Sequence, residues 1–321
     1  MKFKPLDVLF SPTADCNLSC RHCQSEKSKQ TLSITRAETF LESCRKVGVK
    51  RIGFTGGEPF LFPKFLYRIV RRGIELGFFF GRLMTNGVWF RNKNQLNSVL
   101  LKLYDCGYDG SICVSVDAFH KSNLNNIALF IKTALKIWGR GDLISLASVR
   151  GADDAETLKI LRRLALKLNA KLKVYSSRVM SIKGDYFFIP ISFIYLSPVG
   201  RASNIKNPWD GKWFKEDFCA GPGNVFMVMP DGLVKPCCGY AGHNELLTVG
   251  DINCDNAARI LKNIKSNFFT RAIFTRGLTG IRKSMEKKRV KFISKTSDHC
   301  FFCNFLLERI PPRLLKQILT E

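Results

Sequence analysis

Short apolar segments alternate with amphipathic segments over the first half of the 321-residue chain, and this alternation restricts the fold more than any other feature. The pattern predicts strands at 6–10, 50–54, 78–84, 111–117, 143–149 and 170–176. It predicts helices between them, at 33–47, 63–76, 93–105, 123–138 and 153–168. Strand–helix units in series favour a parallel sheet with helices outside it. The expected fold class is α/β, a partial (β/α)6 TIM-like barrel with its chemistry at the carboxyl ends of the strands.

The pattern changes near residue 200. Helical periodicity is lost, and glycine, proline, tryptophan and cysteine become frequent. We therefore expect a barrel core at 1–200 and a small C-terminal domain at 201–321. In that second part, the run "FMVMPDGLVKPC" predicts a hairpin that turns at Pro230-Asp231-Gly232. The last segment is predicted to be helical, with a break at Pro311-Pro312.

The chain is strongly basic, with 51 Lys and Arg residues against 26 Asp and Glu residues and a formal charge of +25. Such a charge attracts an acidic partner. The basic residues are spread along the chain without a recognisable nucleic-acid module, so nucleic acid is not the expected partner. The densest basic run, 271–295, is either a solvated helical face or a docking surface for an acidic peptide or phosphate.

No apolar run reaches the roughly 20 residues that a membrane helix needs. The first residues, "MKFKPLDVLFSP", become polar too soon for a signal peptide, so we expect a cytoplasmic protein with no membrane partner. Twelve cysteines in that reducing compartment indicate metal binding, catalysis or packing, and not a disulfide framework.

Three of these cysteines, Cys16, Cys20 and Cys23, lie within the eight residues "CNLSCRHC", directly after the first predicted strand. A structural zinc site or an ordinary iron–sulfur cluster closes with four protein ligands. A set of three leaves one iron of a [4Fe–4S] cluster open to another ligand. A zinc site in this loop would need a fourth ligand nearby, and His22 is the only candidate.

The loop resembles the CxxxCxxC loop of the radical S-adenosylmethionine (SAM) enzymes, and "TGGEP" follows the second strand as it does in that family. The likeness covers most of residues 6–200. It implies that Cys16, Cys20 and Cys23 ligate a [4Fe–4S] cluster that binds SAM. The motif that binds the methionine amine is matched by Gly56, Gly57, Glu58 and Pro59. The glycines would let the backbone approach the ligand, and the Glu58 carboxylate would face the ammonium.

The resemblance assigns further contacts to SAM. His22 occupies the usually aromatic position beside the adenine. Ser115 and Asp117 lie where the fourth strand usually meets the ribose, and Arg150 after the fifth strand would pair with the SAM carboxylate. Asn86 of "TNG" is interpreted as a turn residue. The family's chemistry is reduction of the cluster, cleavage of SAM and hydrogen abstraction from an unactivated C–H bond by a 5′-deoxyadenosyl radical.

A second cysteine set lies in the C-terminal part: Cys219, Cys237, Cys300 and Cys303. It resembles the twitch module, the shortened form of the SPASM extension, which holds one auxiliary [4Fe–4S] cluster. The runs "PVGRA" (198–202) and "VGDI" (249–252) also resemble that module. A zinc ion held by the same four residues is the structural alternative. Four more cysteines are interpreted as packing residues: Cys44, Cys106, Cys113 and Cys254.

Cys238 is adjacent to Cys237, and neighbouring side chains on a strand point to opposite faces, so the two are not expected to bind one cluster together. A spare thiol is a good hydrogen-atom donor. This resembles the radical SAM peptide epimerases, in which a cysteine of the auxiliary domain returns hydrogen to a peptide Cα radical. We therefore predict a catalytic role for Cys238, with a buried core thiol as the alternative.

The leading functional prediction is a radical SAM enzyme that modifies a ribosomally synthesised peptide by L-to-D epimerisation. The alternatives are a twitch-type dehydrogenase of a sugar or cyclitol alcohol, a peptide crosslinking enzyme, and a non-catalytic metalloprotein that binds nucleic acid. The expected partners are a precursor peptide, whose acidic residues the positive charge would suit, and a flavodoxin- or ferredoxin-type electron donor. Because the first strand begins at residue 6, we expect leader recognition to use a separate protein or the barrel mouth.

Overall fold

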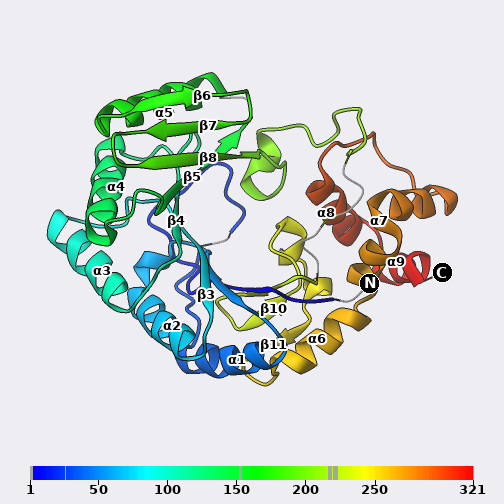
Figure 1. The fold of residues 1–321 in the computed structure, drawn as a ribbon. Helices are drawn as coiled ribbons and strands as arrows, with labels where there is room; N and C mark the ends of the chain where they lie inside the picture. The colour runs from blue at the N-terminus through cyan, green and yellow to red at the C-terminus, as the bar shows by residue number, and fades with distance from the viewer. Residues whose placement is uncertain (1–2, 26, 152–153, 216–218, 220–222, 321) are drawn as a thin grey trace.

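The computed structural model describes residues 3–25, 27–151, 154–215, 219 and 223–320. Within them one sheet has the strand order β11-β10-β9-β1-β2-β3-β4-β5-β8-β7-β6. Its parallel part contains β1 (Asp7–Phe10), β2 (Arg51–Phe54), β3 (Phe79–Thr85), β4 (Ser111–Ser115), β5 (Ile144–Arg150) and β8 (Phe188–Tyr195). In Figure 1 the sheet curves, and α1 to α5 follow its outer side. The predicted α/β class with a partial barrel is confirmed.

The helices of the first half lie where the sequence predicts them, and polar residues set their starts. Their bounds are α1 (Ile34–Lys46), α2 (Pro63–Glu75), α3 (Lys93–Asp105), α4 (Leu124–Trp138) and α5 (Asp154–Lys167). Ser33 caps α1 by accepting a hydrogen bond from the Arg36 amide, and Asn92 caps α3 in the same way through Gln95. The predicted start of α5, residue 153, lies outside the described residues.

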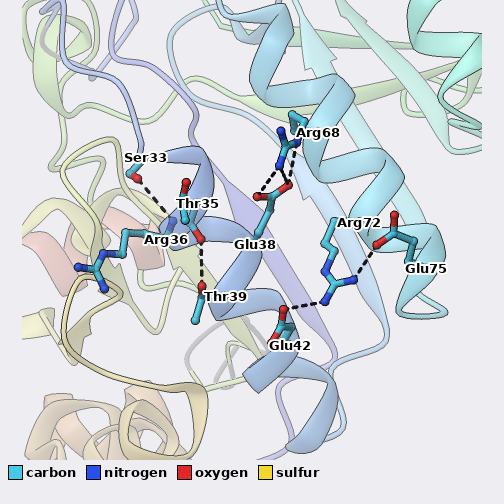
Figure 2. A network of polar contacts seen from close by, with 9 residues as sticks. All are labelled: Ser33, Thr35, Arg36, Glu38, Thr39, Glu42, Arg68, Arg72 and Glu75. Atoms are coloured by element: carbon cyan, nitrogen blue, oxygen red, sulfur yellow. Dashed lines mark hydrogen bonds and ion pairs between the residues drawn. The ribbon is translucent and has the colours of Figure 1, made fainter.

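Alternate side chains along the strands point toward the helices and form the core between sheet and helices. Val8 and Phe10 of β1 are fully buried on the helix side, where the Phe10 ring packs 5.7 Å from the ring of Phe65 in α2. Ion pairs cover the outer surface: Figure 2 shows Arg68 with Glu38 and Arg72 between Glu42 and Glu75. Because exposed ion pairs stabilise little, the buried apolar side chains hold α1 and α2 to the sheet.

The predicted position of the sixth parallel strand is wrong. Residues 170–176 form the edge strand β6 (Lys171–Val174), and β8 takes the place beside β5. Strand β7 (Met180–Lys183) is antiparallel to both β6 and β8. The five residues between β6 and β7 are too few for the crossover that a parallel connection needs. Instead Ser176 Oγ accepts hydrogen bonds from the amides of Arg178 and Val179, and the chain reverses.

The C-terminal part adds three strands to the other side of β1. Strand β9 (Val225–Val228) pairs in parallel with β1, followed by β10 (Leu233–Lys235) and β11 (Gly250–Asp251). The predicted hairpin between β9 and β10 is confirmed, and Gly232 supplies its positive φ of 95°. The predicted boundary near residue 200 stays a prediction.

Four helices and four short 3-10 turns complete the described part of the chain. The helices are α6 (Ala257–Ser266), α7 (Phe268–Lys287), α8 (His299–Arg309) and α9 (Pro312–Thr320), and the short turns are η1 (Pro59–Leu61), η2 (Gly200–Asn204), η3 (Tyr240–His243) and η4 (Glu245–Leu247). The break at Pro311-Pro312 is confirmed. The last helices share a separate apolar core that contains Phe269, Phe302 and Leu306. Among the described helices, none is both long and apolar enough to span a bilayer.

Candidate active site

Cys16, Cys20 and Cys23 converge on a cavity of about 160 Å³ at the carboxyl ends of the parallel strands. Burial raises the pKa of the Cys16 thiol, and burial together with Cys23 and Cys16 raises the pKa of Cys20 to about 12. The three sulfur atoms are thus close enough to disfavour each other's ionisation. Three soft thiol donors in a half-buried loop fit an iron–sulfur cluster, whose positive irons would favour the thiolate forms.

The glycines of "TGGEP" hold this loop in place. The Gly57 amide donates to Thr13 O at 3.0 Å, and the Glu58 amide donates to Asp15 O at 2.8 Å. A Cβ atom on Gly57 would lie 2.1 Å from Asp15 O, and one on Gly56 would lie 2.2 Å from Ser11 Oγ. The close approach that these glycines allow is therefore first of all to the cysteine loop, while both residues also line the cavity.

The Glu58 carboxylate, expected to face an ammonium, is bonded to protein donors in this structure. Glu58 is fully buried, and its carboxylate accepts hydrogen bonds from Thr85 Oγ1 (2.9 Å) and from the amides of Asn86 (2.7 Å) and Phe60 (3.2 Å). These donors belong to the end of β3 and to η1, so the carboxylate joins two segments behind the cavity. The role of this motif in binding SAM stays a prediction.

Asn86 has a larger part than the sequence indicated. Its Oδ1 accepts from the Val88 amide at 2.9 Å, which confirms the predicted turn. Its Nδ2 donates to Asn17 Oδ1 at 2.7 Å and lies 3.8 Å from Cys16 Sγ. Asn86 thus joins the end of β3 to the cysteine loop and also lines the cavity. A turn motif after a strand carries no signal for this second contact.

His22 belongs to a cluster with Asp117 and His120. The rings of His22 and His120 lie 4.7 Å apart, and His120 Nδ1 lies 2.9 Å from the Asp117 carboxylate. Burial lowers the pKa of His22 to about 4, with a further contribution from His120, and its buried Nδ1 has no hydrogen-bond partner among the described residues. His22 is therefore neutral at pH 7, which suits contact with an uncharged aromatic ring such as adenine.

The Asp117 carboxylate is occupied by protein donors, as that of Glu58 is. Besides His120 it accepts from the amides of Phe119 (2.9 Å) and Val149 (3.1 Å). Burial raises its pKa, but the hydrogen bond and charge of His120 and the Val149 amide outweigh burial, so the pKa of Asp117 lies below its ordinary value. Asp117 orients His120, which lines the cavity where the sequence placed Asp117 itself. His120 was missed, although it follows Asp117 by three residues.

Ser115 and Arg150 take different positions. Ser115, at the end of β4, lines the cavity as expected of a ribose contact. Arg150, at the end of β5, donates to Ser177 O, pairs with Asp154 at 3.4 Å, and lies over the ring of Phe193 at 4.8 Å. It is not among the residues that line the cavity. A contact with the SAM carboxylate would require it to leave these partners, and both roles stay predictions.

The second cysteine set also converges. Cys219, Cys237, Cys300 and Cys303 line one small apolar cavity near the amino end of α8, together with His299, which the sequence did not single out. Hydrogen bonds to the Cys219 and Cys300 thiols raise the pKa of His299 to about 10, and burial raises the pKa of Cys237 and Cys303. The cavity encloses only about 20 Å³, so one ion fits it directly, while a four-iron cluster requires the thiols to turn outward.

Cys238 is exposed, so the alternative of a core thiol is wrong. The pKa of Cys238 is nevertheless raised, first by burial of the sulfur atom and then by the nearby Cys219. Asp7 of β1 also raises this pKa. Because β10 runs antiparallel to β9 and β1, the chain after Lys235 leads toward the amino end of β1. The two cysteine sets therefore flank opposite ends of β1. The packing interpretation is confirmed for Cys44, Cys106 and Cys113, which are buried, and wrong for Cys254, which is exposed.

A second cavity of about 590 Å³ lies between the segment after the cysteine loop and the hairpin turn. It shares Gly57 with the first cavity and presents both charge signs, with Lys27, Asp231 and Lys235 among its lining. Lys235 is buried and donates to Thr248 Oγ1 at 2.7 Å and to Asn244 O at 3.0 Å, and burial lowers its pKa. This cavity offers a polar ligand room beside the cysteine loop.

A comparison with protein families decides the assignment, because the family model described as "Radical SAM superfamily" matches residues 10–171. The chain belongs to the radical SAM superfamily. It is accordingly a radical SAM enzyme that uses a [4Fe–4S] cluster and SAM. The matched residues include the cysteine loop and "TGGEP", and they end within β6.

Curated relatives and solved structures agree with this assignment. The chain is 26% identical over 300 residues to a GTP 3′,8-cyclase of Campylobacter fetus subsp. fetus, covering 79% of this chain and 87% of that protein. It resembles the structure of anSMEcpe with bound AdoMet (TM-score 0.56, 14% identity, 98% and 100% covered) and that of BtrN with AdoMet and 2-DOIA (0.51, 16%, 93% and 98%). A further structure, of anSMEcpe with AdoMet and the Cp18Cys peptide, has a TM-score of 0.54 at 15% identity, with 98% and 99% covered. At these identities the structural likenesses establish the fold.

Proposed function

We propose that this radical SAM enzyme epimerises a residue of a ribosomally synthesised peptide from L to D, with Cys238 as hydrogen-atom donor. The observation that carries the proposal is the position of the two cysteine sets at opposite ends of β1. Inversion at a Cα atom requires that hydrogen leave from one face and return to the other. A peptide held in the barrel between the two ends would meet the radical from one side and the thiol from the other.

Each group of residues in the site would have its own role. Cys16, Cys20 and Cys23 would hold the cluster, and the neutral ring of His22 with His120 and Ser115 would enclose the nucleoside part of SAM. When bound and reduced, the cluster and SAM supply a 5′-deoxyadenosyl radical. The raised pKa keeps Cys238 as S–H at neutral pH, which is the form that donates a hydrogen atom.

The proposed steps balance with two electrons and one proton. The first electron enters with SAM cleavage, and the Cα hydrogen passes to the deoxyadenosyl carbon. Cys238 then gives its hydrogen atom to Cα, which leaves a thiyl radical. A second electron from a flavodoxin- or ferredoxin-type donor and a proton from water restore the thiol. We propose that Cys219, Cys237, Cys300 and Cys303 hold an auxiliary [4Fe–4S] cluster that relays this electron.

The first experiment tests SAM cleavage. The anaerobically reconstituted and reduced protein should convert SAM to 5′-deoxyadenosine. Replacing Cys16, Cys20 and Cys23 together with Ala should abolish the product, because the cluster loses its ligands. Formation of 5′-deoxyadenosine at the wild-type rate by this variant would contradict the assignment of the loop.

The second experiment tests the outcome with short peptides encoded beside this gene. In deuterium oxide each converted residue should gain about one mass unit, because the exchangeable thiol delivers deuterium. Cys238→Ala should still form 5′-deoxyadenosine but no D-residue, whereas Cys254→Ala, which removes another exposed thiol, should behave as wild type. An active Cys238→Ala epimerase would overturn the proposed donor, and a product lighter by two hydrogens would indicate a dehydrogenase.

A second candidate function is GTP 3′,8-cyclisation, which the name of the curated relative favours. The formal charge of +25 suits a triphosphate as well as an acidic peptide. Incubation with GTP, SAM and reductant separates the two functions, because a cyclase consumes GTP in step with 5′-deoxyadenosine. We favour the peptide because Cys238 has no part in a cyclisation.

A further inference from the structure

Strand β6 is the outer edge of the sheet, with β7 on one side and no strand on the other among the described residues. The Tyr175 amide donates to Val179 O, so Tyr175 belongs to a hydrogen-bonded pair with the returning chain. Hydrogen-bonded and non-hydrogen-bonded pairs alternate along antiparallel strands. The amides and carbonyls of Leu172 and Val174 therefore point away from β7. They can receive another extended chain.

The surroundings of this edge are uniformly basic. Between residues 157 and 184 the chain has eight Lys and Arg residues and no Asp or Glu. Two of them, Lys171 and Lys173, are exposed on β6 itself. Lysines on an edge strand prevent it from pairing with a second copy of the same chain, because the copy brings the same charges. An acidic strand would neutralise them.

Apolar side chains are exposed at the same place. Three apolar side chains at the turn between β6 and β7 are more than half exposed. Their exposed fractions are 55% for Val174, 63% for Tyr175 and 56% for Val179. A bound strand would cover them while its backbone pairs with β6. A nucleic acid would use the charge but leave the free backbone groups of Leu172 and Val174 without partners. An extended peptide uses all three features.

We infer that β6 is a docking site for an acidic, extended segment of the peptide substrate, which adds to the sheet as a further strand. Arg150, the last residue of β5, donates from its guanidinium to Ser177 O just after β6, which joins the chain after β6 to the carboxyl end of β5. Since β6 is parallel to β5, its carboxyl end lies at the rim where β4 and β5 end and where the SAM cavity opens. A docked segment thus leads its neighbouring residues toward that rim. Figure 1 shows β6 at the outer end of the sheet, distant from α6 to α9.

The inference rests on the proposed peptide substrate, and a model peptide tests it separately. The probe is a fluorescein-labelled 12-residue peptide of alternating glutamate and valine, followed by fluorescence anisotropy. Val174→Pro removes one outward N–H without removing a bond to β7, a change that edge strands tolerate. We expect binding at least tenfold weaker than wild type. Val174→Thr keeps the N–H and should bind within twofold of wild type.

Charge provides a second, independent variant. Lys171→Glu with Lys173→Glu should weaken binding of the acidic peptide at least tenfold, and 0.5 M salt should reduce the difference. Far-ultraviolet circular dichroism and thermal unfolding check that each variant folds, and SAM cleavage without peptide should stay at the wild-type rate. Equal binding by folded Val174→Pro and wild type would overturn the inference. So would a wild-type dimer that Val174→Pro dissociates, or preferential binding of a 12-nucleotide single-stranded DNA.

These outcomes are separate from those of the proposed function. If the substrate is epimerised normally by Val174→Pro and by the charge variant, docking at β6 is wrong and the function stands. If the model peptide binds β6 as expected but no peptide is modified, the proposed epimerisation is wrong and the acidic-strand site remains.

Discussion

The backbone amide of Asn86 donates a 2.7 Å hydrogen bond to the carboxylate of Glu58. This bond joins the end of β3 to the "TGGEP" segment, and Asn86 in turn contacts the cysteine loop through Asn17. The Glu58 carboxylate is therefore a structural group of the site. Its surroundings lead to a prediction about pH.

Glu58 should make stability depend on pH between about 4.5 and 7. Burial raises its pKa to about 7, against the effect of its three hydrogen-bond donors. Because the folded-state pKa lies above the unfolded value, the stabilisation is complete below pH 4.5 and is lost as pH rises through 7. Between pH 5 and pH 8 the free energy of unfolding of wild type should fall by about 2–3 kcal/mol relative to Glu58→Gln. Urea denaturation measures the free energy of unfolding of both proteins, and a difference between them that is the same at pH 5 and pH 8 would contradict the prediction.

Gly57→Ala should displace the cysteine loop. The new Cβ atom would lie 2.1 Å from Asp15 O, which is backbone and cannot rotate away. We expect a loss of stability of about 1–3 kcal/mol and less than half of the wild-type iron bound by the N-terminal loop after reconstitution. Gly81→Ala in β3 is the matched control, since its nearest contact would be 3.6 Å. Equal iron content in both variants would show that the loop accommodates the methyl group.

Asp117→Asn should destabilise the ends of β4 and β5. The amide NH2 would face donors that now bond to the carboxylate, including Val149, so we expect a loss of about 1–3 kcal/mol at pH 7. The folded pKa of Asp117 lies below 3.8, so its stabilisation is present above that value and is lost as pH falls through the folded pKa. The difference in the free energy of unfolding between wild type and Asp117→Asn should therefore become smaller below pH 4. Unfolding curves at pH 3 and pH 7 measure this difference, and an equal difference at both pH values would refute the prediction.

The second cysteine set should bind iron without the first. In the Cys16, Cys20 and Cys23 triple Ala variant, reconstitution should leave about four irons per chain, since four thiolates hold one cluster. Adding Cys300→Ala and Cys303→Ala should remove most of that iron. Iron and zinc are measured together after anaerobic purification. Zinc at one equivalent with no iron would favour the single ion that the small cavity fits directly.

Local patterns predicted the fold and the two sets of converging cysteines well, because these depend on periodicity and spacing. Ser33, Gly232 and the Pro311-Pro312 break act through their own backbone, so their positions follow from the sequence. The position of residues 170–176 in the sheet did not follow from the sequence, because a strand pattern does not say which strand will pair with it. His120 and His299 enter their sites through contacts with Asp117 and with Cys219 and Cys300, which no spacing rule contains.

The pairing of β1 with β9 has a consequence for how the chain acquires its structure. Asp7 is the partner of Val225, so β1 leaves the ribosome more than 200 residues before the strand that completes its hydrogen bonds. At about 5–20 residues per second this delay is on the order of 10 to 40 seconds. During that time one edge of β1 is open beside the cysteine loop. Chaperones and cluster-assembly proteins would therefore meet the three thiols before the sheet is complete.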